Sequence, residues 1–569
     1  MKRYLSFFAA SALLLGGCDF LEVEQDGILS PEQVDRPEQI DNFVIAAYSS
    51  LGNDHYDTPL SLWCYGNLRS DDAYKGGRGQ DDQQESDFME RATNIRTTFS
   101  MPDNLWYLCY VAISRSNTAL RKLNAVTEEE FPLREQRIGE MRFLRGHFYF
   151  LLKELFKYVP YLDETVPTQQ YETISNRALS NDELWQRIAD DFKAAYDRLP
   201  DVQEEVGRPT RYAAAAYLAK VKLYKAFAQD DRNNVVGLNT DDLEEVLTYT
   251  DEVLGSSCTL QADFANNFMP EYQNGCEAIF SVQFSHGDGT MFGRLNFSDV
   301  LNAPQGIGGS DFHKPSQNLV NAFKTENGLP MFDTFNESDY GYEGSTYLSD
   351  YTRIGQSVDP RLYHTVALPG MPFKYDEAYV YRTDWNRNIG VYGIYASLKE
   401  NVSPASDCFV QMAPFVANSK NRIILRYADV LLMRAEALIE LNRDLAAARE
   451  LINRVRTRAA QSASRLTAHV GNIAVAPYGD DTPLTQDYLR RAVRWERRLE
   501  LAMEGSRFFD LVRWGEADEV MNAYYTKEQT LRTYLKGAYF DKNREEYLPI
   551  PEQQIGYSKG LYEQNYGWE

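Results

Sequence analysis

Hydrophobic residues recur at helical spacing through most of the first half of the chain. In the segment 133–159, for example, Ile138, Met141, Leu144, Phe148 and Leu152 fall on one face, which predicts a long helix that ends before Pro160. The same pattern predicts further helices over 102–125, 181–199, 210–228 and 241–254. These helices follow one another as pairs, at the period of helix–turn–helix solenoid repeats, although no pair carries a clean tetratricopeptide consensus. Stacked pairs of this kind bury a continuous core.

The pattern changes over residues 264–420. Glycine, proline, asparagine, aspartate and aromatic residues dominate there, and the apolar runs are short, as in Ala278–Val282. This composition, with its short apolar runs, predicts a loop-rich lobe with few short strands and no helical period. Helical spacing returns over 423–441, 444–460 and 485–503, the last with Gly505 as its expected C-terminal glycine, and a short helix is expected over 506–514.

The expected fold is therefore mainly α: a tetratricopeptide-like scaffold of helix pairs with an inserted, loop-rich lobe. We divide the chain into an N-terminal scaffold (31–263), the variable lobe (264–420) and a C-terminal part of the scaffold (421–569). The two scaffold parts are expected to fold together.

The N-terminus carries an export signal. Lys2 and Arg3 precede the short apolar run Leu5–Leu15, and small residues lead directly to Cys18. The run is too short to span a bilayer, so residues 1–17 are interpreted as a signal peptide. The pattern resembles the lipobox of bacterial lipoproteins, in which Cys18 is lipidated and residues 18–30 form an acidic tether. The alternative is a plain signal peptide in which Cys18 is incidental.

Composition narrows the class of ligand. The chain has 59 basic and 83 acidic residues, a net charge of −24, which repels nucleic acid and favours neutral or cationic ligands. Aromatic residues make up 13%, with 38 tyrosines, as in many secreted proteins that stack rings on sugars. Besides Cys18 there are five cysteines without a CxxC spacing, so zinc or thioredoxin-like chemistry is not expected. Cys258 and Cys276 could form a disulfide, but isolated buried thiols are the preferred interpretation.

Several blocks of the chain resemble the SusD-like (RagB/SusD) family of nutrient-binding outer-membrane lipoproteins. The blocks that carry this resemblance lie in order along the mature chain: 141–150 (MRFLRGHFYF), 207–210 (GRPT), 359–362 (DPRL), 426–438 (RYADVLLMRAEAL), 452–459 (INRVRTRA), 495–514 (WERRLELAMEGSRFFDLVRW), 547–552 (YLPIPE) and 564–567 (QNYG).

The resemblance implies a cell-surface lipoprotein that captures oligosaccharides, or oligopeptides in some members. It also implies delivery of the ligand, without chemistry, to a partner TonB-dependent outer-membrane (SusC-like) transporter. The charged residues of the shared blocks are interpreted as structural, because their spacing pairs charges along and between helices: Glu496, Arg497, Arg498, Glu500, Glu504, Arg507, Asp510 and Arg513.

Catalytic signatures are missing from the sequence. It has no HExxH, GxSxG, Walker or GxGxxG motif, and its six histidines lack metal-ligand spacing. The segment 384–388 (DWNRN) alternates oxygen ligands like the start of a calcium loop, but a polar turn is favoured because the glycine falls one place late and no glutamate stands at position twelve. We expect no enzyme activity, no metal and no cofactor.

Two loop regions are candidates for ligand contacts, because rings and planar polar groups match the C–H faces and hydroxyls of sugars. In the first region the candidates are Trp63, Tyr65, Asn67, Arg69, Asp71, Asp72 and Tyr74, and the alternative is that Trp63 and Tyr65 pack against the helices. In the second region the candidates are Tyr340, Tyr342, Tyr347, Trp385 and Asn386, and the alternative is that each of them packs the lobe.

Three other functions stay open at the level of sequence. The same scaffold could bind oligopeptides, it could serve as an interaction scaffold without a small ligand, or some pair among the 83 carboxylates could form a glycosidase dyad.

Overall fold

The protein is described from a computed structural model that covers residues 36–290, 293–467 and 469–569. The predicted signal peptide, the predicted tether and Cys18 lie outside the described residues. Within the described ranges, no helix combines the length and the apolar character that crossing a membrane requires.

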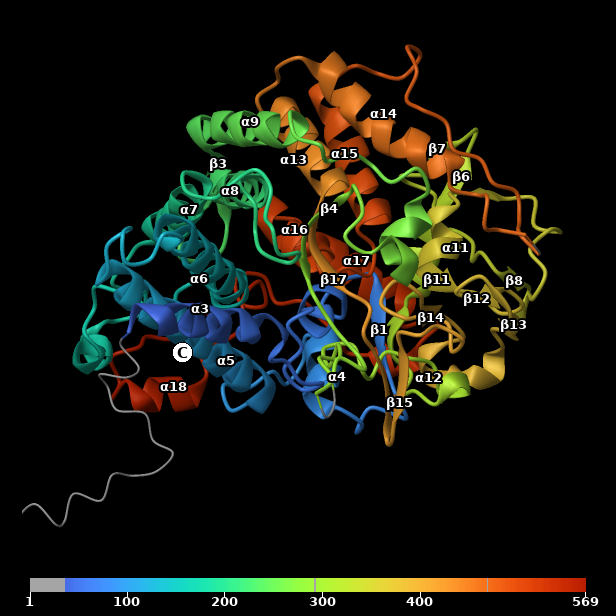
Figure 1. Ribbon diagram of the computed structural model, residues 1–569. Helices are drawn as coiled ribbons and strands as arrows, with labels where there is room; N and C mark the ends of the chain where they lie inside the picture. The colour runs from blue at the N-terminus through green and yellow to red at the C-terminus, as the bar shows by residue number, and fades with distance from the viewer. Residues whose placement is uncertain (1–35, 291–292, 468) are drawn as a thin grey trace, which may run out of the picture.

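Long antiparallel helices form one side of the molecule (Figure 1). The helices before the lobe are α3 (Ile40–Tyr48), α4 (Gln84–Glu90), α5 (Ser100–Asn124), α6 (Arg134–Phe156), α7 (Asn181–Tyr196), α8 (Arg211–Ala226) and α9 (Thr240–Leu254). The helices after it are α13 (Tyr427–Glu440), α14 (Leu445–Gln461), α15 (Gln486–Glu500), α16 (Arg507–Trp514), α17 (Ala517–Glu528) and α18 (Glu552–Tyr557). The predicted mainly helical fold of paired helices is confirmed.

Local sequence explains how the helix pairs start and pack. Ser180 and Glu183 form a capping box that begins α7, and the Thr210 hydroxyl caps α8. Ala213–Ala216 on α8 are fully buried, and such small side chains let α7 and α9 approach closely. Successive helices from α5 to α9 pack on one another, and α9 packs against α13 (Figure 1), so the two scaffold parts form one continuous stack.

The lobe consists mainly of short antiparallel strands and turns, most of which lie at the right of Figure 1. Its strands are β4 (Ala278–Val282), β5 (Phe312–Pro315), β6 (Lys324–Glu326), β7 (Leu329–Pro330), β8 (Tyr342–Glu343), β9 (Thr346–Tyr347), β10 (Ser357–Val358), β11 (Val366–Ala367), β12 (Pro372–Phe373), β13 (Asp376–Val380), β14 (Ala396–Ser397), β15 (Phe409–Met412) and β16 (Phe415–Asn418). It also holds three short helices: α10 (Gln317–Ala322), α11 (Arg361–Thr365) and α12 (Ile389–Tyr392). These helices have six residues or fewer, which is too short to produce a helical period in the sequence.

Several helix ends differ from the prediction by a few residues, and two of these differences have a tertiary cause. The helix expected from Ile423 begins only at Tyr427, because β17 (Arg422–Arg426) pairs with β4, with Ile423 opposite Ser281. The helix expected to run to Met503 ends at Glu500. Gly505, with φ of +86°, lies beyond that end, where its backbone packs directly on Gly66. Tertiary pairing overrides local pattern at both places.

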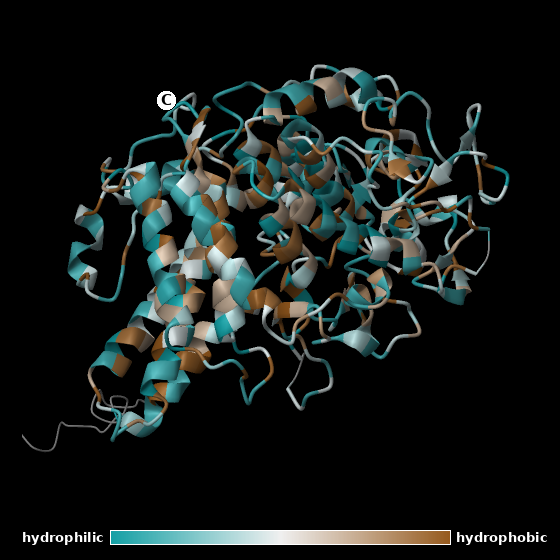
Figure 2. Ribbon diagram, turned by 90° about the horizontal axis from the view of Figure 1, so that it is seen from above, coloured by the Kyte–Doolittle hydropathy of each residue, from teal (hydrophilic) through white to brown (hydrophobic). Residues whose placement is uncertain are grey.

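A large hydrophobic core joins scaffold and lobe. In Figure 2 hydrophobic residues are concentrated on helices near the centre, and the outlying loops are mostly hydrophilic. The central helix α6 is buried on nearly every side, as expected for a helix surrounded by others.

Buried ion pairs add a second link between lobe and scaffold. Glu500 of α15 accepts hydrogen bonds from Arg426 of β17, from Arg458 of α14 and, at 2.8 Å, from Arg361 of α11. All four residues are buried. The charged residues of the shared sequence blocks thus pair between elements, as predicted, and they do so inside the core.

Candidate functional site

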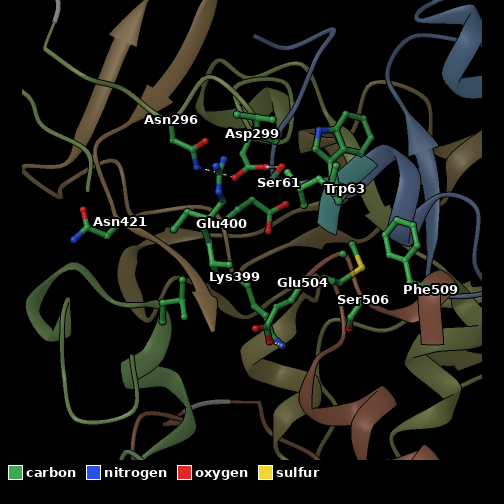
Figure 3. A pocket seen from close by; sticks show the side chains of 18 of the residues that line it. Ser61, Trp63, Asn296, Asp299, Lys399, Glu400, Asn421, Glu504, Ser506 and Phe509 are labelled. Carbon is green, nitrogen blue, oxygen red and sulfur yellow. Dashed lines mark hydrogen bonds and ion pairs between the residues drawn. The ribbon is translucent and has the colours of Figure 1, made fainter. Parts of the chain in front are cut away.

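A cavity opens where the scaffold meets the lobe (Figure 3). Its empty space, which includes open solvent at the mouth, is about 1080 Å³, and the part of it that water-sized molecules can occupy is about 160 Å³. The scaffold contributes α6, α8 and α16, and the lobe side contributes the segments around residues 296–299, 399–400 and 420–424. A concave space of this kind, between parts of a chain, is the usual setting for a small-molecule site.

The scaffold side of the cavity is rich in rings. The ring of Phe150 lies edge-on to Tyr217 and Tyr224, with centroids 5.8 Å and 5.2 Å apart. Phe509 of α16 and Trp63 also line the cavity and are labelled in Figure 3. The wall is therefore apolar, but each of these rings is less than 9% exposed, so little of their surface faces the open space.

Two titratable groups stand among these rings. The Nδ1 atom of His147 lies 2.6 Å from the hydroxyl of Tyr217, and burial lowers the pKa of His147 to about 3, so its imidazole is neutral at pH 7. Burial raises the pKa of Glu154 to about 8. The Glu154 carboxyl has no hydrogen-bond partner among the described residues, and as a neutral acid it can donate one to a ligand.

The opposite wall is polar and tightly hydrogen-bonded. Asp299 accepts bonds of 2.7 Å from the Ser61 hydroxyl and from the Asn296 amide (dashed in Figure 3). Lys399 donates to Glu504 at 2.7 Å, and burial lowers the pKa of this lysine to about 8. A ligand in the cavity thus faces rings on one side and fixed polar groups on the other.

Trp63 is the residue of the first predicted region that lines this cavity. It begins the single π-helical turn η3 (Trp63–Asn67), and its Nε1 donates to the Ser298 carbonyl at 3.0 Å. Asn67, at the end of the turn, lies behind the wall. Its Nδ2 is 2.8 Å from His313 Nε2, and its Oδ1 accepts from the Gly505 amide at 3.0 Å. Asn67 therefore positions the wall without facing the ligand space.

Asp71 and Asp72 are ion-pair partners inside the core. Asp71 Oδ1 accepts from Arg507 Nε at 2.9 Å, and Asp72 Oδ1 accepts from Arg498 Nε at 3.0 Å. Burial alone would raise the pKa of Asp71, but the charges of Arg498 and Arg507 outweigh it and lower the pKa to about 2. Both carboxylates hold the N-terminal segment to the C-terminal helices, which corrects the expectation of ligand contacts.

Tyr65, Arg69 and Tyr74 are also enclosed. Tyr65 and Tyr74 have no exposed surface, and the Tyr74 hydroxyl donates to Glu528 of α17. The Arg69 guanidinium lies 4.2 Å from the ring centre of Phe508 in α16. Helices from the C-terminal part of the chain cover these side chains. They therefore pack inside the protein and do not face a ligand.

The second predicted region divides in two. Tyr340, Trp385 and Asn386 are buried within the lobe, so packing describes these three as well. Tyr342 and Tyr347 are only partly buried and face each other across β8 and β9, with ring centroids 5.1 Å apart. These two rings stay predictions as ligand contacts.

Most cavity residues carried no signal in the sequence. Lys399, Glu400 and Lys420 come from loops of the lobe, and Asn421 directly follows it. In the cavity they lie beside helices α6 and α8, more than 170 residues earlier in the chain, and α16, more than 80 residues later. No motif links them, because only the folded chain brings them together.

No further chemistry is evident in the part of the chain that the structure describes. Among those residues, no three His, Cys, Asp or Glu side chains are grouped to hold a metal ion. Asp384 pairs with Arg382 at 3.0 Å, in keeping with a polar turn. Cys258 and Cys276 are free, in line with isolated thiols, but Cys276 is exposed and Cys258 partly so, which corrects the expectation that both are buried.

The fold and the cavity define a ligand-binding protein on a helical-repeat scaffold. The model described as the SusD family matches residues 276–568, and a second, described as "Starch-binding associating with outer membrane", matches residues 19–223. The chain belongs to the SusD family, whose proteins bind ligands without catalysing a reaction.

Individual relatives are distant but similar over their whole length. SusD-like protein P2 of Formosa agariphila is 25% identical over 578 residues and covers both chains completely. A SusD-like protein of Bacteroides fragilis has a TM-score of 0.71 at 22% identity, covering 95% of this chain and 99% of its own. A structure described as a laminarin binding SusD-like protein has a TM-score of 0.65 at 22% identity, covering 94% and 99%. At such identities these structures support the fold alone.

Proposed function

We propose that this protein is a lipid-anchored, surface-exposed protein of the outer membrane that binds oligosaccharides and delivers them to a partner TonB-dependent transporter. Cys18 would carry the lipid. Membership of the SusD family, the starch-binding and outer-membrane description of the second family model, and the laminarin-binding relative support this proposal.

The observation that carries the proposal is the cavity between scaffold and lobe. It combines ring-lined and hydrogen-bonding walls, which is the combination that sugars require. A few aromatic contacts of about 0.5–1.5 kcal/mol each, with hydrogen bonds, give roughly millimolar to micromolar affinity. Such weak binding suits a protein that must release its ligand to a transporter.

Filling the cavity is expected to abolish most of the binding. Ser506 lines the cavity, and its side chain makes no capping hydrogen bond at the start of α16. The Ser506→Phe variant places a ring in the ligand space without removing a structural bond. We expect at least a tenfold loss of affinity, about 1.4 kcal/mol, for a polysaccharide that the wild-type protein retards in affinity gel electrophoresis.

Two further variants make this test specific. Ser114→Phe places the same ring on the exposed face of α5 and should leave binding unchanged. The double variant Tyr342→Ala/Tyr347→Ala probes the β8–β9 pair. If it abolishes binding while Ser506→Phe does not, the saccharide lies on the hairpin and not in the cavity. If the wild-type protein binds none of a broad polysaccharide panel, the proposed function fails.

Delivery requires a stable complex with the transporter. Permanent interfaces bury about 2,000–5,000 Å², so we expect the protein to co-purify with a TonB-dependent transporter after mild detergent extraction of outer membranes. The Cys18→Ala variant should lose its lipid and leave the membrane fraction. Recovery of the wild-type protein only as a free monomer would contradict the delivery step.

A further inference from the structure

Two lysines in the cavity wall, Lys220 and Lys420, have no hydrogen bond or ion pair at their ammonium groups within the described ranges, and Lys420 is the more buried of the two. Lys420 lies between β16 and β17 and is only 6% exposed. Its backbone N–H donates to Asn418 Oδ1 at 3.1 Å, but its ammonium group has no hydrogen bond or ion pair within the described ranges. The side chain is largely buried, but the ammonium nitrogen is not among the buried atoms without a partner, so it keeps access to the open space of the cavity and can bind a group from outside the chain.

Two other cations of the cavity wall have partners within the chain: Lys399 pairs with Glu504 at 2.7 Å, and Arg422 pairs with Asp54 at 3.0 Å. Lys374, which does not line the cavity, donates to the carbonyls of Phe268 and Leu398 at 3.0 Å each. The spare hydrogen-bonding capacity of Lys420 therefore distinguishes it from these three cations.

The nearby carboxylates do not have a free oxygen to offer Lys420. Asp299 accepts hydrogen bonds from Ser61 and Asn296, at 2.7 Å each. Glu400 accepts from Ser397 at 2.5 Å and pairs with His313 at 2.7 Å. Glu504 accepts from Lys399 and Arg426. The unpaired group on this wall is therefore the Lys420 ammonium, a positively charged hydrogen-bond donor.

The effect of burial on Lys420 agrees with this geometry. Burial lowers the pKa of Lys420, and the negative charges of Asp299 and Glu400 only partly oppose the shift. An anion bound against the ammonium would restore the charged form. The overall charge of −24 does not prevent this, because at physiological salt charges beyond about 8 Å are largely screened.

We propose that Lys420 forms an anion subsite in the cavity and binds a carboxylate or sulfate group carried on a sugar ring. The ring of that sugar would lie in the remaining space, towards the aromatic wall of α6 and α8. This inference rests on the proposed function, in that it names the class of saccharide that the cavity takes: acidic rather than neutral.

The test compares three monosaccharides by ligand-observed NMR titration: methyl β-D-glucuronide, glucose 6-sulfate and methyl β-D-glucoside. We expect the wild-type protein to bind at least one of the two anions about tenfold more tightly than the glucoside. The carboxylate and sulfate arms show which group the subsite takes. Lys420→Gln should bring the preferred anion within about twofold of the glucoside, and Lys420→Arg should keep most of the preference.

Matched lysine variants locate the effect. Lys536 is exposed and lines none of the cavity, so Lys536→Gln should bind like the wild type. Lys220 is a second cation in the cavity wall, where its ammonium lies 5.4 Å from the Phe150 ring centre. Loss of the anion preference in Lys220→Gln but not in Lys420→Gln would overturn the assignment to Lys420. Thermal melting of each variant shows whether it is folded.

The remaining outcomes separate this inference from the proposed function. Equal binding of the acidic and neutral sugars by the wild-type protein would overturn the anion subsite and leave saccharide binding intact. Binding of trialanine through Lys420, together with no binding of any mono- or polysaccharide, would overturn both the sugar assignment and the proposed function.

Discussion

Glutamine in place of Glu500 is expected to destabilise the protein by about 3–5 kcal/mol, the usual result of removing one charge from a buried ion-pair cluster. Glu500 is fully buried and contacts Arg361, Arg426 and Arg458, which come from three different elements. The variant leaves this cluster with unbalanced positive charge. Urea denaturation followed by circular dichroism, or a fall in Tm, measures the effect.

An exposed ion pair provides the control for this prediction. Glu244 pairs with Arg443 at 2.6 Å, and both side chains are about half exposed. Glu244→Gln should cost less than about 1 kcal/mol, since surface pairs contribute little. Equal effects of the two substitutions would show that the Glu500 cluster does not stabilise the junction of lobe and scaffold.

The same prediction has a defined pH dependence. Burial would raise the pKa of Glu500, but the charges of Arg458, Arg426 and Arg361 hold it well below its usual range. The stabilisation is therefore complete above the unfolded-state pKa of about 4.3 and is lost as the pH falls below it. The stability gap between wild type and Glu500→Gln should narrow by about 1.4 kcal/mol per pH unit below that value.

Alanine at Gly66 is expected to destabilise the protein by about 3 kcal/mol, at the upper end for overpacked cores. A Cβ atom at this position would lie 1.8 Å from the Gly505 carbonyl oxygen and 2.9 Å from its Cα. Both contacts are with backbone, so no side-chain rotation can relieve them. Chemical denaturation, or loss of soluble protein, would reveal the effect.

Gly556 offers the matched substitution without a clash. It lies in α18, and a Cβ atom there would have nothing within 4 Å. Gly556→Ala should be neutral or stabilise the protein by up to about 1 kcal/mol, because alanine favours the helix. Normal stability of Gly66→Ala would mean that the segment of residues 63–67 is not packed on Gly505.

The helical scaffold could be predicted from sequence because its signals are local. The apolar positions of α6 and the capping pair Ser180 and Glu183 lie within a few residues of one another. The strand β17 was missed for the opposite reason: its partner β4 lies about 140 residues away, and the pairing overrides the helical pattern of Ile423.

The predicted ligand residues show the same limit. The segment of residues 63–74 has the composition of a sugar-binding loop, yet most of it is buried. Arg498 and Arg507 lie more than 400 residues further along the chain, and they form ion pairs with the carboxylates of Asp72 and Asp71. Composition alone cannot distinguish a polar group that meets a ligand from one that meets a distant side chain.

The paired-helix fold, the loop-rich lobe and the family could be predicted from the sequence, because periodicity, capping and shared motifs are properties of neighbouring residues. The position of the cavity and the side chains that line it became known from the folded chain. Trp63, Glu154 and Lys420 belong to segments that are far apart in the chain. Whether such side chains are buried or paired with a charge depends on contacts between these segments, so local sequence does not identify them as cavity residues.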